Sequence, residues 1–510
     1  MKTAIKRIIP FIIAAAAACM FFSVFFVYLL AIAYPPYTLY QHEQYLASDN
    51  LDGRFVGTAG IFEAEEYIAG QFARAGIDPL PGDDDFYQEF TLQRFGFDRG
   101  KTSCSITGKP GSFTISLGEN YRPLPFSDEG AAAGPLVFAG YGITSKDDNW
   151  DDYNGIDIKG KIAVVFRGEP KTVFSGTRPS RHSFFQTKAK NAHSHGAAGL
   201  IIITTPFNND RGEDFRLDER YFLPGAVVSP RKPVPNRSFP SIQISTNLAD
   251  KFFSSMGTTI DKCIRELDNK TPASEFILKD FSADIQVSML EQPENMTARN
   301  VAGFLPGNDP ELKNEWIVVG AHHDHLGSYD GTGDTIFNGA DDNASGTAGV
   351  IELARYFAPR QNELKRSMVF VTFSAEEVWL HGSAAFLEKE LPAGVKIAAM
   401  CNLDMIGRNP DGPLEIIRRT PLPHFTKIVN EAQAKTGQFI YYYSLDSDYF
   451  SDDMSFVKKK IPTLFFFSGT HEDYHTVDDE SDRILYNVFY KRIEYIKEII
   501  RLLARENLFD

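Results

Sequence analysis

"EWIVVGAHHDHLG", residues 315–327, joins a continuous apolar run to three histidines and an aspartate. The chain has only 11 histidines, and His322, His323 and His325 fall within four positions here. The run before them is apolar at every position from Trp316 to Val319. Because alternate residues of a strand point to opposite faces, such a run predicts a strand that is buried on both faces of a parallel sheet.

The sequence after this strand alternates between helix-like and strand-like segments. The expected helices are 345–359, 381–391 and the amphipathic closing segment 486–507, and the expected strands are 367–374, 395–404 and 461–469. Strands that alternate with helices are typical of a parallel sheet covered by helices. The sequence therefore predicts an α/β fold, with a mixed, mostly parallel sheet and helices on both of its faces.

Acidic and imidazole residues gather just beyond the carboxyl ends of these strands. The groups are "AHHDH" (321–325), "SAEE" (374–377), "NLDM" (402–405), "GTHEDYHT" (469–476) and, before a predicted helix, "GADDNASG" (339–346). Most of these groups alone have an ordinary structural explanation, such as helix capping, but Asp404 would otherwise be an unpaired charge at a buried strand end. Ligands of open α/β sheets bind outside the carboxyl ends of the strands, so five groups there predict one site. His, Asp and Glu without Cys suit a catalytic Zn²⁺.

Composition limits the partners and the number of domains. A chain of 510 residues exceeds one ordinary core and predicts two domains. The net charge of −15 argues against a nucleic-acid partner, because phosphate binding needs concentrated Lys and Arg. The four cysteines show no CxxC spacing and no disulfide framework, and a single Cys104–Cys263 bridge is the alternative outside the cytoplasm. The oligomeric state is not indicated.

The N-terminus predicts a membrane anchor. Lys2, Lys6 and Arg7 precede an uncharged apolar run from Ile8 to Ala33, which exceeds the roughly 20 residues that a membrane-spanning helix needs. No Lys or Arg follows until Arg54, so the positive-inside rule places the bulk of the chain outside the cytoplasm. A cleaved secretion signal is the alternative, because "AIA" (31–33) matches a cleavage site.

Four parts follow from these patterns. Residues 1–34 are the predicted transmembrane anchor, and residues 40–118 and 279–510 are the two parts of the main domain. Between them, residues 119–278 contain short β-rich runs punctuated by glycine, such as "GKIAVVFRG" (160–168). This change of texture predicts a separate β-rich domain inserted into the main one.

The motifs together resemble a known family. "GAHHDHLG", "GADDNASGTAGVIELAR", "FSAEEVWLHGS", "NLDMIGR" and "HEDYHTVDD" are similar, in this order, to the co-catalytic zinc aminopeptidases of the aminopeptidase Y type. That family also includes secreted bacterial leucyl aminopeptidases and glutamate carboxypeptidase. Residues 119–278 resemble the protease-associated domain inserted in such enzymes, and "LDGRFVGTAG" (51–60) resembles the family's N-terminal approach to the main domain.

The resemblance implies a role for each residue that matches a motif. Two Zn²⁺ ions would share Asp342 as a bridging ligand. One ion would be held by His322 and Asp404, and the other by Glu377 and His475. The general base would be Glu376, and Tyr474 would help to hold the developing oxyanion. The expected activity is hydrolysis of N-terminal residues from peptide substrates.

General chemistry supports this division of roles. Two metals about 3.5–4 Å apart need a bridging carboxylate, and they bind both the attacking water and the scissile carbonyl. A carboxylate that is not a ligand takes the proton and passes it to the leaving amine. Adjacent residues at a strand end point to different sides, so Glu376 and Glu377 are free to have different roles.

Two pairings compete within the histidine cluster, since alternate residues share a face: His322 with Asp324, or His323 with His325. A ligating histidine normally donates its other N–H to a carboxylate, and Asp324 is placed to receive it from His322. The family pattern "G-A-H-x-D" falls on the same pair. We therefore expect His322 to be the ligand and Asp324 to orient it, with His323 and His325 as bystanders.

Two rival functions remain. A glutaminyl cyclase resembles this fold but uses a single zinc, and a non-catalytic receptor or scaffold would be expected to lack ligands, whereas all five are present. One position departs from the family pattern: Asp453, in "SDDMSF", stands where relatives often carry His or Gln. Because that stretch lies near the substrate in the family, the preferred side chain and the recognition of the amine are not indicated.

Overall fold

The computed structural model divides into two compact units, residues 1–89 with 299–510 and residues 90–298, which are described separately. It describes residues 35–505 except 96, 109–110, 114, 119, 125, 171, 175–179, 181, 204–226, 230–237, 256, 270–277, 279, 290–293, 329–332, 410–413, 423, 438–440 and 445–449. The predicted anchor, residues 1–34, lies outside the described residues. Among the helices that are described, none is both long and apolar enough to cross a membrane.

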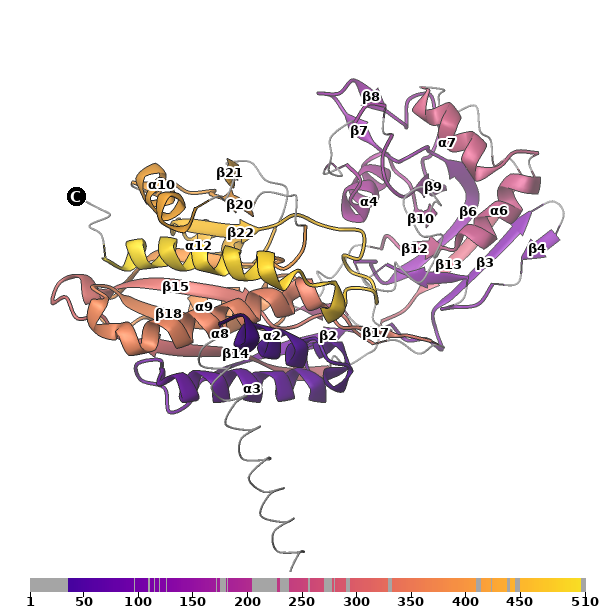
Figure 1. Cartoon of the computed structure of the whole chain (residues 1–510). Coiled ribbons are helices and arrows are strands. Elements are labelled where there is room, and N and C mark those ends of the chain that lie inside the picture. The colour runs from indigo at the N-terminus through magenta and orange to yellow at the C-terminus, as the bar shows by residue number, and fades with distance from the viewer. Residues whose placement is uncertain are drawn as a thin grey trace, which may run out of the picture. The chain divides into compact units, whose positions relative to one another are not determined.

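The first unit is built on a mixed sheet (Figure 1). Its central strands are β18 (Ser367–Phe373), β15 (Glu315–His322), β19 (Lys396–Leu403) and β22 (Thr463–Phe467), and neighbours among these four are parallel. On one side, β14 (Glu294–Leu305) is antiparallel to β18 and is followed in the sheet by β2 (Tyr87–Phe95), while the short β11 (Val227–Ser229) lies in the residue range of the second unit. On the other side, β20 (Leu414–Ile417) is antiparallel to β22 and pairs with β21 (Tyr441–Ser444), while the short β1 (Asp78–Pro79) pairs with β14.

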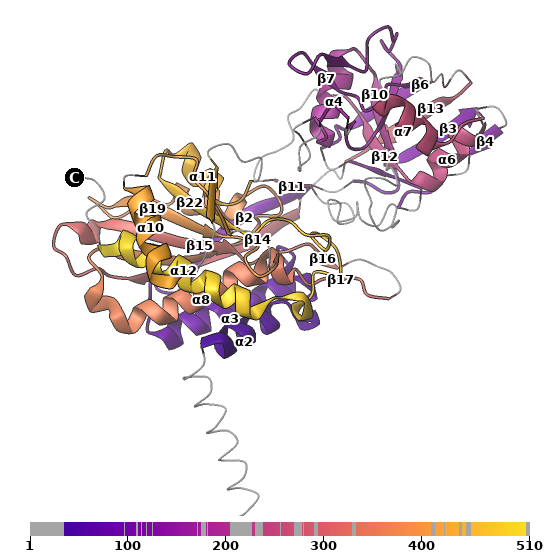
Figure 2. The same cartoon turned by 45° about the horizontal axis from the view of Figure 1, so that its top comes forward.

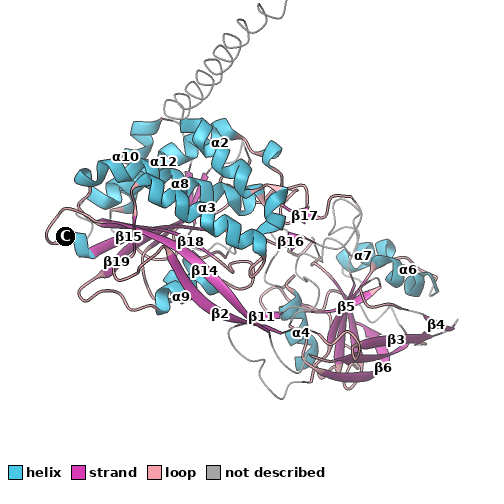
Figure 3. Ribbon diagram, turned by 90° about the horizontal axis from the view of Figure 1, so that it is seen from below, coloured by secondary structure: helices cyan, strands magenta, loops and turns pink. Residues whose placement is uncertain are grey.

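Helices cover both faces of this sheet (Figure 3). One face carries α2 (Pro35–Leu46), α3 (Ala59–Ala75), α8 (Gly346–Phe357), α10 (Phe425–Thr436) and α12 (Tyr486–Arg505), which share one core with the sheet. The opposite face packs on α9 (His381–Glu388) and α11 (Asp453–Lys458) through Phe386 and Phe456. The strand β15 contributes Ile317 and Val319 to the first core and Trp316 and Val318 to the second, which explains its continuous apolar run.

The second unit has an eight-stranded sheet of its own (Figure 2). Its order is β4 (Gly111–Phe113), β3 (Ser103–Gly108), β13 (Ser282–Val287), β6 (Gly130–Phe138), β9 (Ile162–Phe166), β10 (Gly199–Ile203), β12 (Ser241–Ile244) and β5 (Tyr121–Pro123). The helices α4 (Phe185–Ser194), α6 (Thr246–Ser255) and α7 (Ile260–Asp268) accompany it. The small hairpin of β7 (Thr144–Ser145) and β8 (Trp150–Asp151) completes the unit.

The observed unit extends beyond the predicted insert, 119–278, at both ends. The reason is strand pairing, because β13 pairs with β3 on one side and β6 on the other. Both β3 and β13 lie outside the predicted boundaries but inside this sheet. The boundary of a domain depends on which strands pair, and short β-rich runs do not show this.

Candidate metal centre

Every predicted ligand follows the carboxyl end of a strand or begins a helix. His322 is the last residue of β15, Glu377 follows β18, and Asp404 directly follows β19. Asp342 lies in the short segment Ala340–Ser345 directly before α8, where its own backbone is not helical, and His475 lies in the loop after β22. All five ligands, together with Glu376 and Tyr474, line one pocket. The parallel central strands bring these residues together, because their carboxyl ends meet at one edge of the sheet.

The carboxylate of Asp342 lies between the two predicted zinc-binding histidines. Its Oδ1 is 3.2 Å from His322 Nε2, and its Oδ2 is 2.9 Å from His475 Nε2. His322 Nε2 is also 3.6 Å from Asp404 Oδ1, and His475 Nε2 is 3.3 Å from Glu377 Oε2. Each side of the carboxylate therefore faces one histidine and one further acid, which is the arrangement of a bridging ligand.

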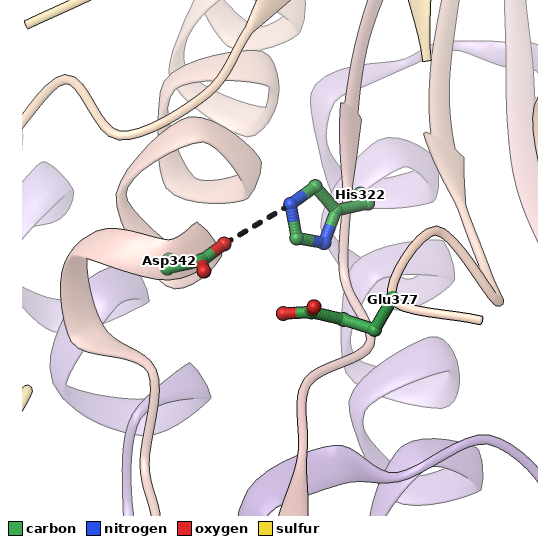
Figure 4. A group of neighbouring side chains, drawn as sticks. All are labelled: His322, Asp342 and Glu377. Carbon is green, nitrogen blue, oxygen red and sulfur yellow. Dashed lines mark ion pairs between the residues drawn. The ribbon is translucent and has the colours of Figure 1, made fainter. Parts of the chain in front are cut away.

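The donor set fits metal ions. Two groups of residues each place one ligand atom within 4.8 Å of the others: His322 with Asp342 and Glu377 (Figure 4), and His322 with Glu376 and Asp404. The second group includes the residue that was predicted to be the base. Burial lowers the pKa of His322, but the carboxylates of Glu376 and Asp404 outweigh it and raise this pKa well above its ordinary value. The surroundings of His322 Nε2 thus stabilise positive charge, which a metal ion would supply.

Glu376 and Glu377 are adjacent, yet their surroundings shift their pKa values in opposite directions. Burial and the nearby charge of Glu377 raise the pKa of Glu376 well above its ordinary value, against the opposing effect of His322. Burial and Asp342 oppose the ionisation of Glu377, but His475 and a hydrogen bond from His325 outweigh them and lower its pKa to about 2. Opposite shifts in two neighbouring carboxyls are the pattern expected of an acid–base group beside a permanently ionised one.

The Asp324 side chain binds backbone groups rather than the ring of His322. The Asp324 Oδ1 atom is 3.7 Å from His322 Nδ1. The backbone carbonyl oxygen of Asp324 is nearer to the same nitrogen, at 3.1 Å. The two carboxylate oxygens of Asp324 accept the backbone N–H groups of Glu376 and Glu377, at 3.0 and 3.2 Å. The Asp324 side chain therefore fixes the backbone of the predicted base and ligand, whereas the His322 ring bonds the Asp324 backbone carbonyl, and the predicted hydrogen bond from His322 to the Asp324 carboxylate is not formed.

The structure corrects the expectation that His325 is a bystander. It is fully buried, and its Nδ1–H donates to Glu377 Oε1 at 2.7 Å, so it orients a predicted ligand from the side opposite to His475. His323 differs, since its Nδ1 forms a hydrogen bond with Thr372 Oγ1 at 3.0 Å and its Nε2 lies 3.5 Å from Glu65 Oε1 of α3. His323 therefore joins β15 to its neighbours, and it is not among the residues that line the pocket.

Asp479 is a site residue that the sequence did not single out. Its carboxylate accepts the backbone N–H groups of Asp341, at 3.1 Å, and of Asp342, at 3.0 Å. The carboxylate of Asp341 in turn accepts the backbone N–H of Gly407, three residues after Asp404. These bonds fix the turn that carries the bridging carboxylate.

Tyr474 and Asp453 have different positions. The Tyr474 ring stacks on that of His475, with centroids 3.9 Å apart, and lines the pocket, while its predicted role toward an oxyanion stays a prediction. Asp453 was expected near the substrate, but it is fully buried, forms an ion pair with Arg419 and does not line the pocket.

Arg54 is a second residue whose importance was missed. Its buried guanidinium donates to the backbone carbonyls of His323 at 2.9 Å, Asn338 at 2.7 Å and Gly339 at 3.2 Å. His323 directly follows the predicted ligand His322 in the chain. Asn338 and Gly339 directly precede the segment that carries Asp342. A single planar cation thus connects the two chain segments that present the bridging carboxylate and its histidine.

We expect Arg54→Lys to weaken zinc binding by about 10–100-fold, because the single Nζ of Lys cannot reach the carbonyls that Nε, Nη1 and Nη2 of Arg54 bind together, and the ligand-bearing segments lose their connection. The control is Arg366→Lys. Arg366 is equally buried, but it binds Glu315 and the Leu503 carbonyl at the amino ends of the strands. Both variants should lower Tm, and only Arg54→Lys should lower zinc affinity in a competition titration with a chelator. Equal zinc affinities would contradict this role.

Comparisons with known proteins agree with this geometry. Residues 300–500 match peptidase family M28, and residues 132–232 match the PA domain. Aminopeptidase YwaD of Bacillus subtilis is 25% identical over 453 residues, which cover 86% of this chain and 78% of that protein.

Solved structures show the same fold. An aminopeptidase from Aneurinibacillus sp. strain AM-1 superimposes with a TM-score of 0.61 at 21% identity, covering 93% of this chain and 95% of that one. A zinc aminopeptidase from Bacillus subtilis gives a TM-score of 0.57 at 19% identity, covering 92% and 95%. The predicted fold, a mixed α/β zinc exopeptidase sheet with an inserted domain, is confirmed. Residues 300–500 therefore belong to peptidase family M28, and the second unit carries a PA domain, residues 132–232.

Proposed function

We propose that this protein is a two-zinc aminopeptidase that removes N-terminal residues from peptides. The observation that carries the proposal is the position of Asp342, whose two carboxylate oxygens face His322 and His475 at 3.2 and 2.9 Å. His322, Asp342 and Asp404 would hold one zinc ion, and Asp342, Glu377 and His475 the other. Bound zinc supplies Lewis acidity, which polarises the scissile carbonyl and lowers the pKa of the attacking water.

The residues of the chain carry the proton and orient the groups. Glu376 accepts the proton of the attacking water at its carboxylate and delivers it to the nitrogen of the leaving amine. Asp324 keeps the Glu376 backbone in place, and Tyr474 lies at the pocket wall, where its O–H is a candidate donor to the developing oxyanion.

The charges in the pocket favour an aminopeptidase over a carboxypeptidase. The pocket is lined by four carboxyl side chains, and its lining, within the described part of the chain, includes neither Lys nor Arg. A carboxypeptidase needs a cationic group to bind the terminal carboxylate of its substrate. All four carboxyl side chains are assigned to zinc binding or to proton transfer, so the lining without Lys or Arg, and not a surplus of negative charge, is what disfavours a carboxypeptidase. The apolar part of the lining, formed by Met405, Phe450, Phe465 and Phe467, favours an apolar N-terminal side chain.

A glutaminyl cyclase is the weaker alternative. It would use a single zinc, whereas His475 lies 2.9 Å from Asp342 Oδ2 and 3.3 Å from Glu377 Oε2, so these three residues offer a second group of donors. A receptor of the same fold is disfavoured as well, because its pocket would have no reason to keep both sets of ligands.

The test is a set of matched peptides that begin with leucine, with the amino end free or acetylated and the carboxyl end free or amidated. We expect hydrolysis of the first peptide bond only when the amino end is free, and amidation of the carboxyl end should have little effect. Cleavage that instead requires a free carboxyl end would overturn the aminopeptidase assignment. Cyclisation of N-terminal glutamine without hydrolysis would favour the cyclase.

We also propose that the two units work outside the cytoplasm, with residues 1–34 as the anchor; the charge distribution around Ile8–Ala33 supports this. A chain that begins at Pro35 should be soluble and as active as the full chain, measured by leucine release after ultracentrifugation. The control deletes residues 1–47 and so removes α2, whose Leu39 and Leu46 are buried in the core of the first unit. That control should lower Tm or fail to fold. Aggregation of the first variant would show that residues 1–34 belong to the fold.

A further inference from the structure

Trp379 is an exposed aromatic residue beside the predicted catalytic carboxylates. Its side chain is 68% exposed, and it lies two residues after the ligand Glu377. The structure describes five large hydrophobic residues as exposed, and a second one, Phe450 at 59%, lines the pocket itself. Exposed indoles are rare because burying them is strongly favourable, so one beside an active site indicates a binding surface.

The backbone holds Trp379 in an unfavourable conformation. Its φ is +89°, in the left-handed region where glycine is favoured and a bulky residue is an outlier. The N–H groups of Trp379 and Leu380 both donate to the carbonyl of Glu376, at 3.0 Å. The turn that places the indole is therefore anchored on the predicted base, and its strain is retained at the exposed position. Retained strain at such a position points to a function rather than to packing.

The position of Trp379 relative to the pocket identifies what it binds. In an aminopeptidase the N-terminal residue occupies the pocket, and the rest of the peptide must extend from the scissile bond toward solvent. Trp379 is not among the residues that line the pocket, yet it is joined through the Glu376 carbonyl to the turn where the bond is cut. Because Glu376 lines the pocket and the exposed Trp379 lies three residues after it in the same turn, we infer that the peptide leaving the pocket passes the indole.

We propose that Trp379 is a specificity-determining residue that binds the side chain of the second residue of the peptide, on the leaving side of the scissile bond, and selects apolar or aromatic residues there. This inference rests on the proposed aminopeptidase function. An indole recognises apolar and aromatic side chains by stacking and by burial of apolar surface, with little dependence on hydrogen bonds.

The test compares kcat/KM for peptides that begin with Leu-Phe and with Leu-Gly, in the full chain and in two variants. The ratio of Leu-Phe to Leu-Gly should fall by about five- to tenfold in Trp379→Ala and equally in Trp379→Gly. The glycine variant should have the higher Tm of the two, because glycine adopts a positive φ without strain. If the ratio falls in Trp379→Ala but equals that of the unmodified chain in Trp379→Gly, then the backbone of the turn, and not the indole, sets the preference.

Leu391→Ala is the matched control. Leu391 is also an exposed large hydrophobic, at 36%, but it lies in the segment that leads into the amino end of β19, at the opposite edge of the parallel strands. In Leu391→Ala, the ratio of kcat/KM for Leu-Phe to that for Leu-Gly should equal the ratio of the unmodified chain. A fall as large as that of Trp379→Ala would overturn the assignment to Trp379.

Fluorescence provides a readout that does not depend on turnover. The chain has three tryptophans, and Trp316 is buried while Trp379 is exposed. In a Glu376→Gln background, adding a Leu-Phe peptide should shift the emission to the blue, and adding Leu-Gly should shift it less. The same titration with Trp379→Phe should remove the shift. Absence of the shift, when the peptide demonstrably binds by calorimetry, would contradict the proposal.

The two proposals fail in different ways. If the unmodified chain releases no N-terminal residue from free peptides, the aminopeptidase function is wrong. If it releases leucine, but the Leu-Phe to Leu-Gly ratio is unchanged in both Trp379 variants, only the assignment of Trp379 is wrong.

Discussion

Replacing Glu376 with Gln is expected to lower kcat by about 10²–10⁴-fold while the protein keeps its fold and both zinc ions. Glutamine has nearly the same shape, but it cannot accept the proton of the attacking water. The Glu376 backbone is fixed by the Asp324 carboxylate, which the substitution does not touch. The measurements are single-turnover kinetics on a leucyl peptide and zinc content by metal analysis.

Glu377→Gln is the matched control, since it makes the same chemical change at the next residue. Glu377 lies 3.3 Å from His475 Nε2 and receives a hydrogen bond from His325, and its pKa is held at about 2, as expected of an ionised ligand. Its variant should therefore lose zinc together with activity. Near-normal turnover in a Glu376→Gln protein that contains both metals would remove Glu376 from the role of base.

The gathering of the site residues could be predicted because it depends on topology alone. His322, Glu377 and Asp404 follow parallel strands, and parallel strands end at one edge of a sheet wherever the helices between them pack. Knowledge of the strand order was not required. The burial of β15 on both faces could also be predicted, because its run of residues is apolar on both faces.

The residues that support the ligands could not be predicted in this way. Arg54 binds a carbonyl 284 positions away, and Asp479 binds the backbone N–H of Asp342 137 positions away. Each of these contacts involves the backbone of the partner, so the identity of the partner residue carries no signal. The bond from His325 to Glu377 joins two side chains, but the alternation of strand faces wrongly paired His325 with His323, because β15 ends at His322 and the alternation does not continue.

The second large effect concerns the histidine cluster. His322→Ala is expected to lose about one zinc ion per chain and nearly all activity, because Nε2 faces both Asp342 and Asp404 at 3.2 and 3.6 Å. The matched control is His323→Ala, the same change at the next residue. His323 contacts Thr372 and Glu65 and does not line the pocket, so its variant should be less stable but should retain both zinc ions.

Asp324→Asn separates orientation from ligation. Asparagine keeps the size of the side chain, but its amide nitrogen cannot accept the N–H of Glu376 or Glu377, so one of the two bonds becomes a repulsive contact. We expect a loss of about 10–100-fold in kcat/KM, with zinc retained at saturating concentrations. An Asp324→Asn protein as inactive and as metal-free as His322→Ala would place Asp324 among the ligands themselves.

Zinc stoichiometry in these variants decides between the two pairings of the cluster. If His322 is the ligand, zinc content falls in His322→Ala and stays at two in His323→Ala. His325→Ala should fall between them, because it removes a hydrogen bond to Glu377 at 2.7 Å but no atom from the metal. The opposite order, a metal-depleted His323→Ala beside an intact His322→Ala, would require the side chains at the end of β15 to face the other way. The backbone hydrogen bond from His323 N–H to the Phe373 carbonyl at 2.9 Å, which fixes the strand register at this point, opposes that reversal.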